Sequence, residues 1–340
     1  MERKGVKRWG LVLLMAMGLY GCAGPYSLVE FEVLEPATVN FPADVENLVI
    51  LNRAPFTLDV ISEQNREGMK REHLIMVDTL ITNHLFRGVR EVMNNSPFPT
   101  FQYPVWLTER RSDTAGLEDL VLTRREVADL CRETTSDAVI SLEFYSVALD
   151  EEYTYYSDDP TVVRTHFYEV SNEILWNIYL PDRPRPFDEY RMVDTLFFPV
   201  VVEGQFQIVP SLTEMIAELF FSSGVKYGQY LVPVWTPAAR VVIRGRNDSL
   251  KTASKLTSGG EWEEAYHLWR DLTRSDDSAV AAKAYHNLAV FYELEDRLDS
   301  ASFLIDQALK LDALEVTRNY REKMDTRLQN REILESQISR

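Results

Sequence analysis

The chain of 340 residues is strongly acidic, since 53 Asp and Glu residues outnumber 36 Lys and Arg residues and the formal net charge at pH 7 is −17. A surface with this charge repels nucleic-acid phosphates and anionic lipid head groups, which excludes proteins that bind either of them electrostatically. Hydrophobic residues make up 45% of the chain and charged residues 26%, as in a globular body with a core of ordinary size.

The first residues have the anatomy of an export signal. Four basic residues, Arg3, Lys4, Lys7 and Arg8, precede an apolar run from Trp9 to Tyr20. That run is shorter than the roughly 20 residues that a helix needs to cross a bilayer. We therefore predict a signal peptide over residues 1–21 and no membrane-spanning helix.

The apolar run ends in Leu19, Tyr20, Gly21 and Cys22. This tetrapeptide resembles the lipobox of bacterial lipoproteins, although Tyr20 stands where that pattern prefers a small residue. The resemblance implies that Cys22 is lipidated, and that acyl chains such as palmitate hold residues 22–27 as a tether at the membrane. The alternative is an ordinary signal peptide followed by an incidental cysteine.

The residues after Cys22 bear on its place in the envelope. Ala23 stands where the best-known lipoprotein sorting systems use Asp to retain a protein in the inner membrane, so this resemblance implies the outer membrane. The acidic cluster that marks surface export in Bacteroidetes-type lipoproteins is not seen there, and we expect the body to face the periplasm. Cys131 has no partner once Cys22 is lipidated. Its neighbours Val127 and Leu130 favour a buried, unreactive thiol and no disulfide.

Residues 28–240 are typical of a domain with mixed α and β structure. Alternating or continuous apolar residues predict strands at 28–34, 47–52, 103–107 and 137–148. Apolar residues at helical spacing predict one long amphipathic helix from Lys70 to Met93, whose apolar stripe we expect to lie on a sheet. Thr123 caps a shorter helix, with Glu126 at the capping-box position.

Two longer strands follow, at 162–180 and 189–202, joined by a proline-rich turn. They predict a wide antiparallel hairpin. Ile174, Trp176 and Ile178 alternate with Glu173, Asn177 and Tyr179, so we expect the first set to be buried and the second to be wet. Ser211 caps a helix that runs to about Tyr230. The fold class is therefore α+β or α/β, a mixed sheet with helices packed on it.

Beyond Arg240 the pattern changes to helix alone and contains an internal repeat. Residues 285–313 resemble a tetratricopeptide repeat. The matching positions are Tyr285, Leu288, Ala289, Tyr292, Ala301, Ile305 and Ala308. Asp296 replaces the turn Gly and Ala313 replaces the closing Pro. A weaker copy upstream places Gly260, Ala265 and Trp269 at 36 residues before Asp296, Ala301 and Ile305.

We therefore predict two tetratricopeptide-like repeats over 246–313 and a charged capping helix over 314–340. In repeat proteins the concave face holds peptides, so this module is a candidate partner-binding surface. The alternative is a structural cap on the α/β domain.

The search for catalytic or metal-binding residues is negative. The five histidines, His73, His84, His166, His267 and His286, show no metal-ligand spacing, and there is no Gly-rich phosphate loop and no Gly-x-Ser-x-Gly elbow. We predict no enzyme activity, no catalytic residue, no cofactor and no metal. The acidic and tyrosine-rich stretch 150–159 offers ligands for calcium or a sugar, but its pattern favours a solvated hairpin tip. Asp113-Thr114-Ala115 matches an O-glycosylation pattern of Bacteroidetes exports.

Over nearly its full length the chain resembles a family of uncharacterised Bacteroidetes lipoproteins that join an α/β body to C-terminal tetratricopeptide repeats. The segments that carry the resemblance are Val33-Leu34-Glu35-Pro36-Ala37, Pro233-Val234-Trp235 and Glu261-Trp262-Glu263-Glu264-Ala265. The resemblance implies no activity, because the family has none assigned.

Our leading hypothesis is a non-enzymatic scaffold, tethered to the outer membrane through Cys22, whose repeats and sheet edge bind another envelope protein. One alternative is a glycan- or peptidoglycan-binding protein that uses Tyr153, Tyr155 and Tyr156. Another is a hydrolase whose site the residue pattern does not disclose. We expect no nucleic acid as a partner, and the oligomeric state stays open.

Overall fold

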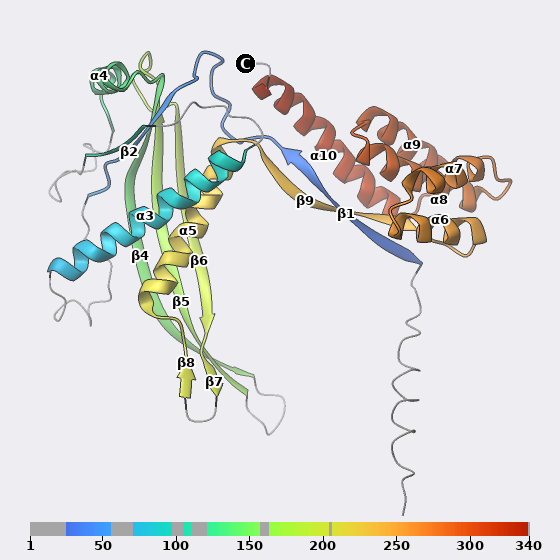
Figure 1. Ribbon diagram of the computed structural model, residues 1–340, viewed down its shortest axis with the longest axis horizontal. Coiled ribbons are helices and arrows are strands. Elements are labelled where there is room, and N and C mark those ends of the chain that lie inside the picture. The colour runs from blue at the N-terminus through green and yellow to red at the C-terminus, as the bar shows by residue number, and fades with distance from the viewer. Residues whose placement is uncertain are drawn as a thin grey trace, which may run out of the picture. The chain divides into compact units, whose positions relative to one another are not determined.

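The computed structural model describes residues 25–55, 71–96, 105–109, 121–156, 163–203 and 206–338. These residues belong to two compact units. The helical unit comprises the chain up to Val33 together with Thr236–Glu332, and the α/β unit comprises Leu34–Trp235 together with Ile333–Arg340. Figure 1 labels the elements of both units.

The α/β unit is built on a mixed sheet of five strands in the order β3-β2-β4-β5-β6 (Figure 1). The strands are β2 (Leu48–Asn52), β3 (Val105–Thr108), β4 (Ala138–Tyr156), β5 (Val163–Tyr179) and β6 (Asp188–Pro199). β2 runs parallel to β3 and β4, whereas β4, β5 and β6 are antiparallel neighbours. The strands β7 (Val201–Glu203) and β8 (Phe206–Ile208) form a separate short hairpin. The predicted fold class and the predicted wide hairpin are confirmed.

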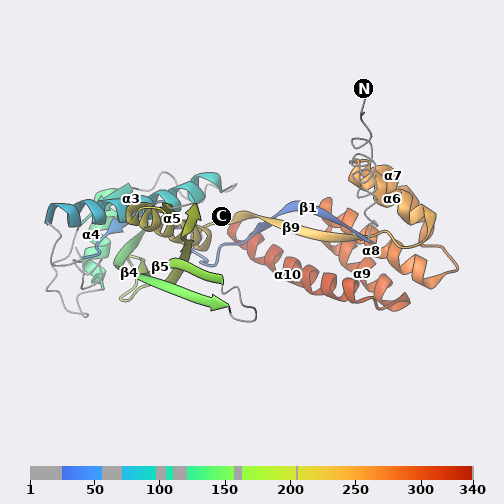
Figure 2. The ribbon, with the colours of Figure 1, turned by 90° about the horizontal axis from the view of Figure 1, so that it is seen from below.

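Two helices, α3 (Arg71–Asn95) and α5 (Leu212–Leu231), lie side by side on one face of this sheet (Figure 2). Ile81 and Leu85 of α3 are fully buried, and they belong to one core cluster with Ile140 and Trp176 of the sheet. Burial of such apolar surface stabilises the fold by about 25 cal/mol per Å². The long amphipathic helix therefore lies on a sheet, as its spacing predicted.

Glycines allow α3 and α5 to cross at main-chain contact. A Cβ added to Gly88 would collide with the carbonyl oxygen of Phe221 and would lie 2.7 Å from the amide nitrogen of Val225. A Cβ added to Gly224 would collide with the carbonyl oxygen of Leu85. Main-chain atoms cannot move aside as a flexible side chain can, so these positions exclude every larger residue without a shift of the helices.

The opposite face of the sheet is covered beside β2 by α4 (Arg124–Thr134). Thr123 and Glu126 form the predicted capping box at its start. Cys131 of α4 is buried against the sheet, as its apolar neighbours predicted.

Polar side chains are also buried on this α4 side of the sheet. Glu143 of β4 accepts hydrogen bonds from Arg53 at 3.2 Å and from the Tyr179 hydroxyl at 2.8 Å. Asn177 donates to that hydroxyl at 3.0 Å. Only 2% of Asn177 and 1% of Tyr179 are exposed, so the expectation that these two residues are wet is wrong. Alternation correctly separated the two faces of β5, but α4 covers the face that was expected to meet water.

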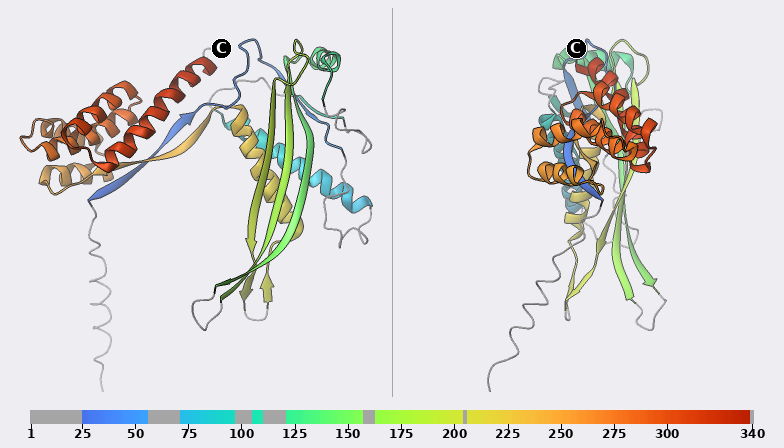
Figure 3. Two further views of the ribbon diagram at one scale, coloured as in Figure 1. Left: turned by 180° about the vertical axis from the view of Figure 1, so that it is seen from behind. Right: turned by 90° about the vertical axis from the view of Figure 1, so that its right-hand side faces the viewer.

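The helical unit contains a two-stranded ribbon, β1 (Tyr26–Glu35) with β9 (Val234–Ile243), whose two strands Figure 3 shows side by side. The strands run in opposite directions, because Pro25 meets Arg244 and Ser27 meets Val242. The helices that follow are α6 (Asp248–Ser258), α7 (Trp262–Leu272), α8 (Ser278–Leu294), α9 (Leu298–Leu311) and α10 (Glu315–Ile338). This run of helices is consistent with the predicted helical repeats.

β9 departs from the expected domain organisation. We expected helix alone beyond Arg240 and a single α/β domain over 28–240, but the strand continues to Ile243 and the compact units divide after Val33 and after Trp235. The reason is long-range pairing, since Ser27 and Val242, which are in contact, lie 215 residues apart. A pattern read in a local window does not contain that information.

We expect Gly88→Ala to lower the free energy of unfolding by about 1–3 kcal/mol, because the new methyl group overpacks the α3–α5 crossing. Gly259→Ala is the matched control, since its Cβ would meet the flexible carboxylate of Glu261 at 3.3 Å and main-chain oxygens only at the ordinary contact distances of 3.4 and 3.8 Å. Urea unfolding of both variants measures the effect. Equal stability of the two variants would show that the helices do not cross at main-chain contact.

Candidate functional site

The best-defined site in the helical unit is the surface on which β9 lies. We call it the β9 groove and define it by His286, Asn287 and Glu293 of α8 and Tyr320 of α10. All four residues are buried, with at most 4% of their surface exposed.

Asn287 holds the main chain of β9. Its Oδ1 accepts from the amide of Ile243 at 2.7 Å, and its Nδ2 donates to the carbonyl oxygen of the same residue at 2.9 Å. This is how a second strand would pair with that residue, because the carboxamide offers one donor and one acceptor side by side. The side chain therefore recognises an extended backbone without regard to its side chains.

His286 makes the second contact with β9. Its Nε2 lies 2.8 Å from the carbonyl oxygen of Val241, and its Nδ1 lies 3.0 Å from the Thr317 hydroxyl. A carbonyl oxygen only accepts, so we assign the proton to Nε2, and Nδ1 then accepts from Thr317. Burial lowers the pKa of His286 to about 4, although the bond to Val241 works in the opposite direction. The ring is therefore neutral at physiological pH.

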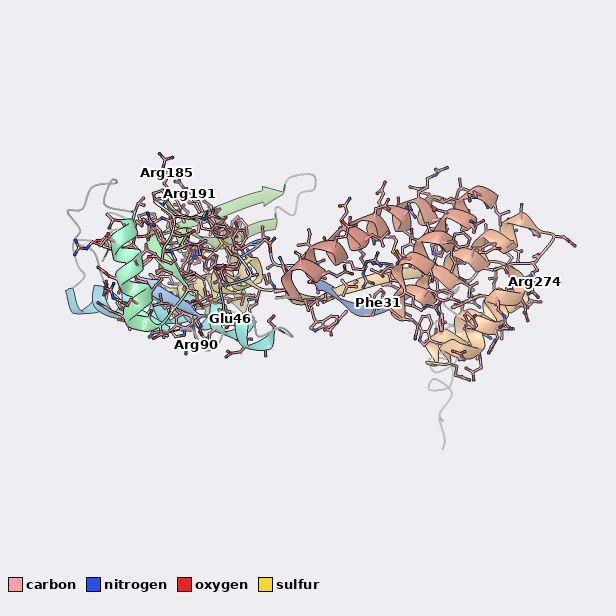
Figure 4. The ribbon with its side chains drawn as sticks, turned by 90° about the horizontal axis from the view of Figure 1, so that it is seen from above. Phe31, Glu46, Arg90, Arg185, Arg191 and Arg274 are labelled. Atoms are coloured by element: carbon pink, nitrogen blue, oxygen red, sulfur yellow. The ribbon has the colours of Figure 1, made fainter. Side chains whose placement is uncertain are left out.

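Arg240 makes the third contact, through its side chain. Its Nε and an Nη donate to the two carboxylate oxygens of Glu293 at 2.8 and 2.7 Å. The guanidinium lies between the rings of Phe31 and Tyr320, 5.4 and 5.6 Å from their centres. Figure 4 labels Phe31 on β1. The groove thus combines backbone recognition with a pocket that accepts one planar cation.

Glu293 has further donors on α10. The Tyr320 hydroxyl lies 2.7 Å from its Oε2, and an Nη of Arg327 lies 3.0 Å from its Oε1. Burial and the neighbouring Glu293 carboxylate raise the pKa of Tyr320 well above its ordinary value, so this phenol stays protonated and donates. The carboxylate is saturated with donors, all from the chain itself.

Within the described residues, the face of α8 that meets β9 is therefore filled. A cleft of about 150 Å³ remains beside it, lined in part by Arg240, His286 and Lys323. The hydrogen-bonding groups of Arg240 and His286 are engaged as above, so the cleft offers few unused polar groups.

A larger cleft of about 430 Å³ lies in the α/β unit, where Asp44, Asp137 and Asp182 gather with Arg183. Asp137 is already engaged, because its Oδ2 accepts from the amide of Glu46 and from both nitrogens of Asn47 at 2.8–3.2 Å. This carboxylate ties the start of β4 to the segment before β2, which is a structural role.

Comparison with protein families places the chain. A family described as Domain of unknown function (DUF8603) matches residues 45–242, more than half of the sequence. The chain belongs to this family. A second family, described as Domain of unknown function (DUF6340), matches residues 251–331. The DUF8603 match ends within β9, and the second match lies within the helices α6 to α10. Both descriptions are of domains of unknown function, so the chain belongs to an uncharacterised family, as the sequence resemblance implied.

The remaining comparisons add no function to this DUF8603 chain. No curated protein matches it. Among solved structures, a neuraminyllactose-binding hemagglutinin homolog from Helicobacter pylori is 10% identical and covers 55% of this chain and 88% of its own, with a TM-score of 0.27. A likeness at that score has no bearing on fold or function here. No helix in the described ranges is long and apolar enough to span a membrane.

The structure keeps the histidines singled out from the sequence apart. His84 and His166 lie in the α/β unit, on α3 and β5, and the Nε2 of His166 is 2.6 Å from a carboxylate oxygen of Glu151. His267 and His286 lie in the helical unit. No group of three His, Cys, Asp or Glu side chains with metal-site geometry occurs among the described residues. Burial raises the pKa of the Cys131 thiol to about 11, which keeps it protonated.

Several predicted sites lie outside the described residues. They are the signal peptide over 1–21, Cys22, Thr114 and the end of the stretch 150–159. The backbone of β4 is described to Tyr156, whereas the side chains of Tyr153, Tyr155 and Tyr156 lie outside the described part of the structure.

The residues of the β9 groove were missed from the sequence. Asn287 and Glu293 stand in a helix that is mostly apolar and aromatic, and polar residues in such a helix are commonly expected to face water. No signal in the sequence indicated their burial, because the strand β9 that pairs with them was not predicted.

We expect acid to destabilise the helical unit through His286. Below pH 6.5 the unfolded chain takes up a proton at this residue, whereas the folded chain does so only near pH 4. Stability present above pH 6.5 is therefore lost as the pH falls to 4, by about 3 kcal/mol.

Urea unfolding across this pH range, in wild type and in His286→Gln, measures the loss. The variant should show a shallower dependence, and His267→Gln, whose side chain is 53% exposed, should retain that of the wild type. If all three curves were parallel, the neutral buried imidazole would be ruled out.

Proposed function

We propose that this protein is a non-enzymatic scaffold, tethered to the outer membrane through lipid on Cys22, which binds another envelope protein through its helical repeats. The observation that carries the proposal is the run of helical hairpins α6–α10. Such repeats bury a continuous core between neighbours and leave extended outer surfaces, which repeat proteins use for binding.

Corresponding positions of the two hairpins support a tetratricopeptide-like repeat. Ala265 and Ala301 are fully buried, as are Trp269 and Ile305, which follow them by four residues. The preceding turns also correspond, because Gly260 and Asp296 both have a positive φ, of 83° and 54°. A left-handed residue is needed to turn the chain between the helices, and Asp adopts this conformation more readily than most residues other than Gly and Asn.

Because the β9 groove is filled, it limits which surfaces the proposed partner can bind. The face of α8 on which the chain's own strand lies is not available to a partner in this state, so the proposed contact uses other surfaces of the repeats. Phe303 on α9, 61% exposed, belongs to such a surface.

Glycan or peptidoglycan binding is the second candidate. It is favoured by one placement, since the paired ends of β4 and β5 carry Tyr153, Tyr155 and Tyr156 at the end of a long hairpin. Aromatic side chains there would offer stacking surfaces to sugar rings.

We expect Cys22→Ala to move the protein from the membrane fraction to the soluble periplasmic fraction, because acyl chains supply the membrane affinity. Fractionation and immunoblotting measure the shift. Cys131→Ala is the matched control and should remain membrane-bound, since that thiol is buried. Membrane retention of Cys22→Ala would contradict the lipid tether.

We expect the tagged full chain to recover one stoichiometric protein from solubilised envelope, and a chain lacking residues 246–340 to lose it. The deletion also removes Gln337, whose side-chain amide forms hydrogen bonds with the main chain of Ala37 in the α/β unit. The control is therefore a cooperative unfolding curve of the truncated chain, which shows that its α/β unit remains folded. Retention on purified peptidoglycan without a protein partner would favour the second candidate and reject the scaffold.

A further inference from the structure

Two arginines of the helical unit lie over two neighbouring tyrosines. The guanidinium carbon of Arg297 is 4.5 Å from the centre of the Tyr292 ring, and that of Arg270 is 5.7 Å from the centre of the Tyr266 ring. The two tyrosine rings are 6.2 Å apart and meet edge to face. Phe291 supports Tyr266 from α8, with ring centres 4.9 Å apart. We call Tyr266, Arg270, Tyr292 and Arg297 the arginine–tyrosine patch.

Both guanidiniums act on the same spot. A hydrogen bond between the hydroxyls of Tyr266 and Tyr292, together with burial, raises the pKa of Tyr292, and the positive charges of Arg297 and Arg270 both oppose that rise. The charges of both cations therefore act on the Tyr292 hydroxyl, although the side chains come from α7 and from the turn before α9.

These cations are poorly neutralised within the described residues. Arg297 is exposed and has no ion pair in the described part of the chain, and the carboxylate of its neighbour Asp296 binds Arg327 at 3.1 Å. Arg270 is 51% exposed, and its Nε makes only a long ion pair, of 4.0 Å, with the exposed carboxylate of Asp271. On a chain of net charge −17, two exposed cations stacked on neighbouring tyrosines stand out.

The start of α9 adds to the positive field. Arg297 is its N-cap residue and makes no side-chain cap hydrogen bond, and the carboxylate of Asp299 in the first turn is paired with Arg331. A helix N-terminus carries a partial positive charge that favours anions. This partial charge comes from the main chain and not from the arginine side chains, and it too favours an anionic ligand.

We infer that the arginine–tyrosine patch binds carboxylate groups of an acidic segment of a partner protein. Stacking on a tyrosine holds each guanidinium in place and leaves its N–H edges available, and those edges match a carboxylate in a bidentate pair. The inference rests on the proposed scaffold function and names the chemistry of its partner.

The chain's overall charge does not prevent this contact. At physiological salt the Debye length is about 8 Å, so the acidic residues elsewhere on the chain are largely screened from a ligand at the patch. A carboxylate in contact with the guanidiniums is screened far less. We therefore expect the affinity for an acidic segment to depend mainly on Arg270 and Arg297 and to fall as the salt concentration rises.

Calorimetric titration of the full chain with a hexaglutamate peptide tests the inference. We expect hexaglutamate to bind, hexaglutamine not to bind, and Arg270→Gln/Arg297→Gln to weaken hexaglutamate binding at least about tenfold. The control Lys310→Gln/Arg318→Gln removes the same charge from exposed positions on α9 and α10 and should bind as the wild type does. Equal affinity of the arginine variant and the wild type would overturn the inference.

Inorganic phosphate serves as a second arm. If phosphate alone bound as tightly as hexaglutamate, the patch would be a general oxyanion site and its assignment to a protein segment would be wrong. Unfolding curves of the two double variants should superimpose, because both replace exposed side chains.

The partner experiment separates this inference from the proposed function. If the full chain recovered no stoichiometric protein, the scaffold function would fail whatever the peptide did. If the partner were recovered equally by the wild type and by Arg270→Gln/Arg297→Gln, the scaffold function would stand and the patch would be excluded as its contact.

Discussion

One buried carboxylate holds the helical unit together. The side chain of Glu293 is 0% exposed and accepts from Arg240 of β9 and from Tyr320 and Arg327 of α10. Removing a carboxylate from water costs several kcal/mol, and only a full set of polar and charged donors offsets that cost. Loss of one donor leaves a charge buried without enough partners, at about 3–5 kcal/mol. The strand and the capping helix therefore keep their places on α8 together.

For the proposed scaffold, this constraint decides which surfaces of the helical unit are open to a partner. β9 already makes hydrogen bonds to Asn287 and Glu293. A peptide bound in the groove would have to replace these bonds. A competing segment would have to match both the backbone pairing and the buried ion pair, and would pay to displace them. Exposed side chains outside the groove are not held in this way, and Arg270 and Arg297 are of that kind.

Local rules predicted most of the elements of this chain and missed the pairing that joins them. Helical spacing gave α3, Thr123 and Glu126 gave the start of α4, and the repeat gave Asp296 in the place of a turn Gly, where the structure has a positive φ. Asn177 was expected to be exposed to solvent but is buried. The helix α4 covers its face of the sheet, and the alternation of residues along one strand does not reveal such a helix. The strand β9 was not predicted at all, because its partner β1 lies about 200 residues earlier in the chain.

The candidate site was harder to predict than the fold, for a physical reason. Burial of an apolar side chain is a property of one helix face and recurs with the helical period, so it leaves a trace in the residues themselves. The polar contacts of Asn287 and Glu293 depend on partners from β9 and α10, and the arginine–tyrosine patch depends on residues from two helices and a turn. Sequence periodicity therefore indicates which apolar side chains are buried, but it does not indicate which polar side chains meet one another. The informative residues of such a site are those whose neighbours are distant in sequence.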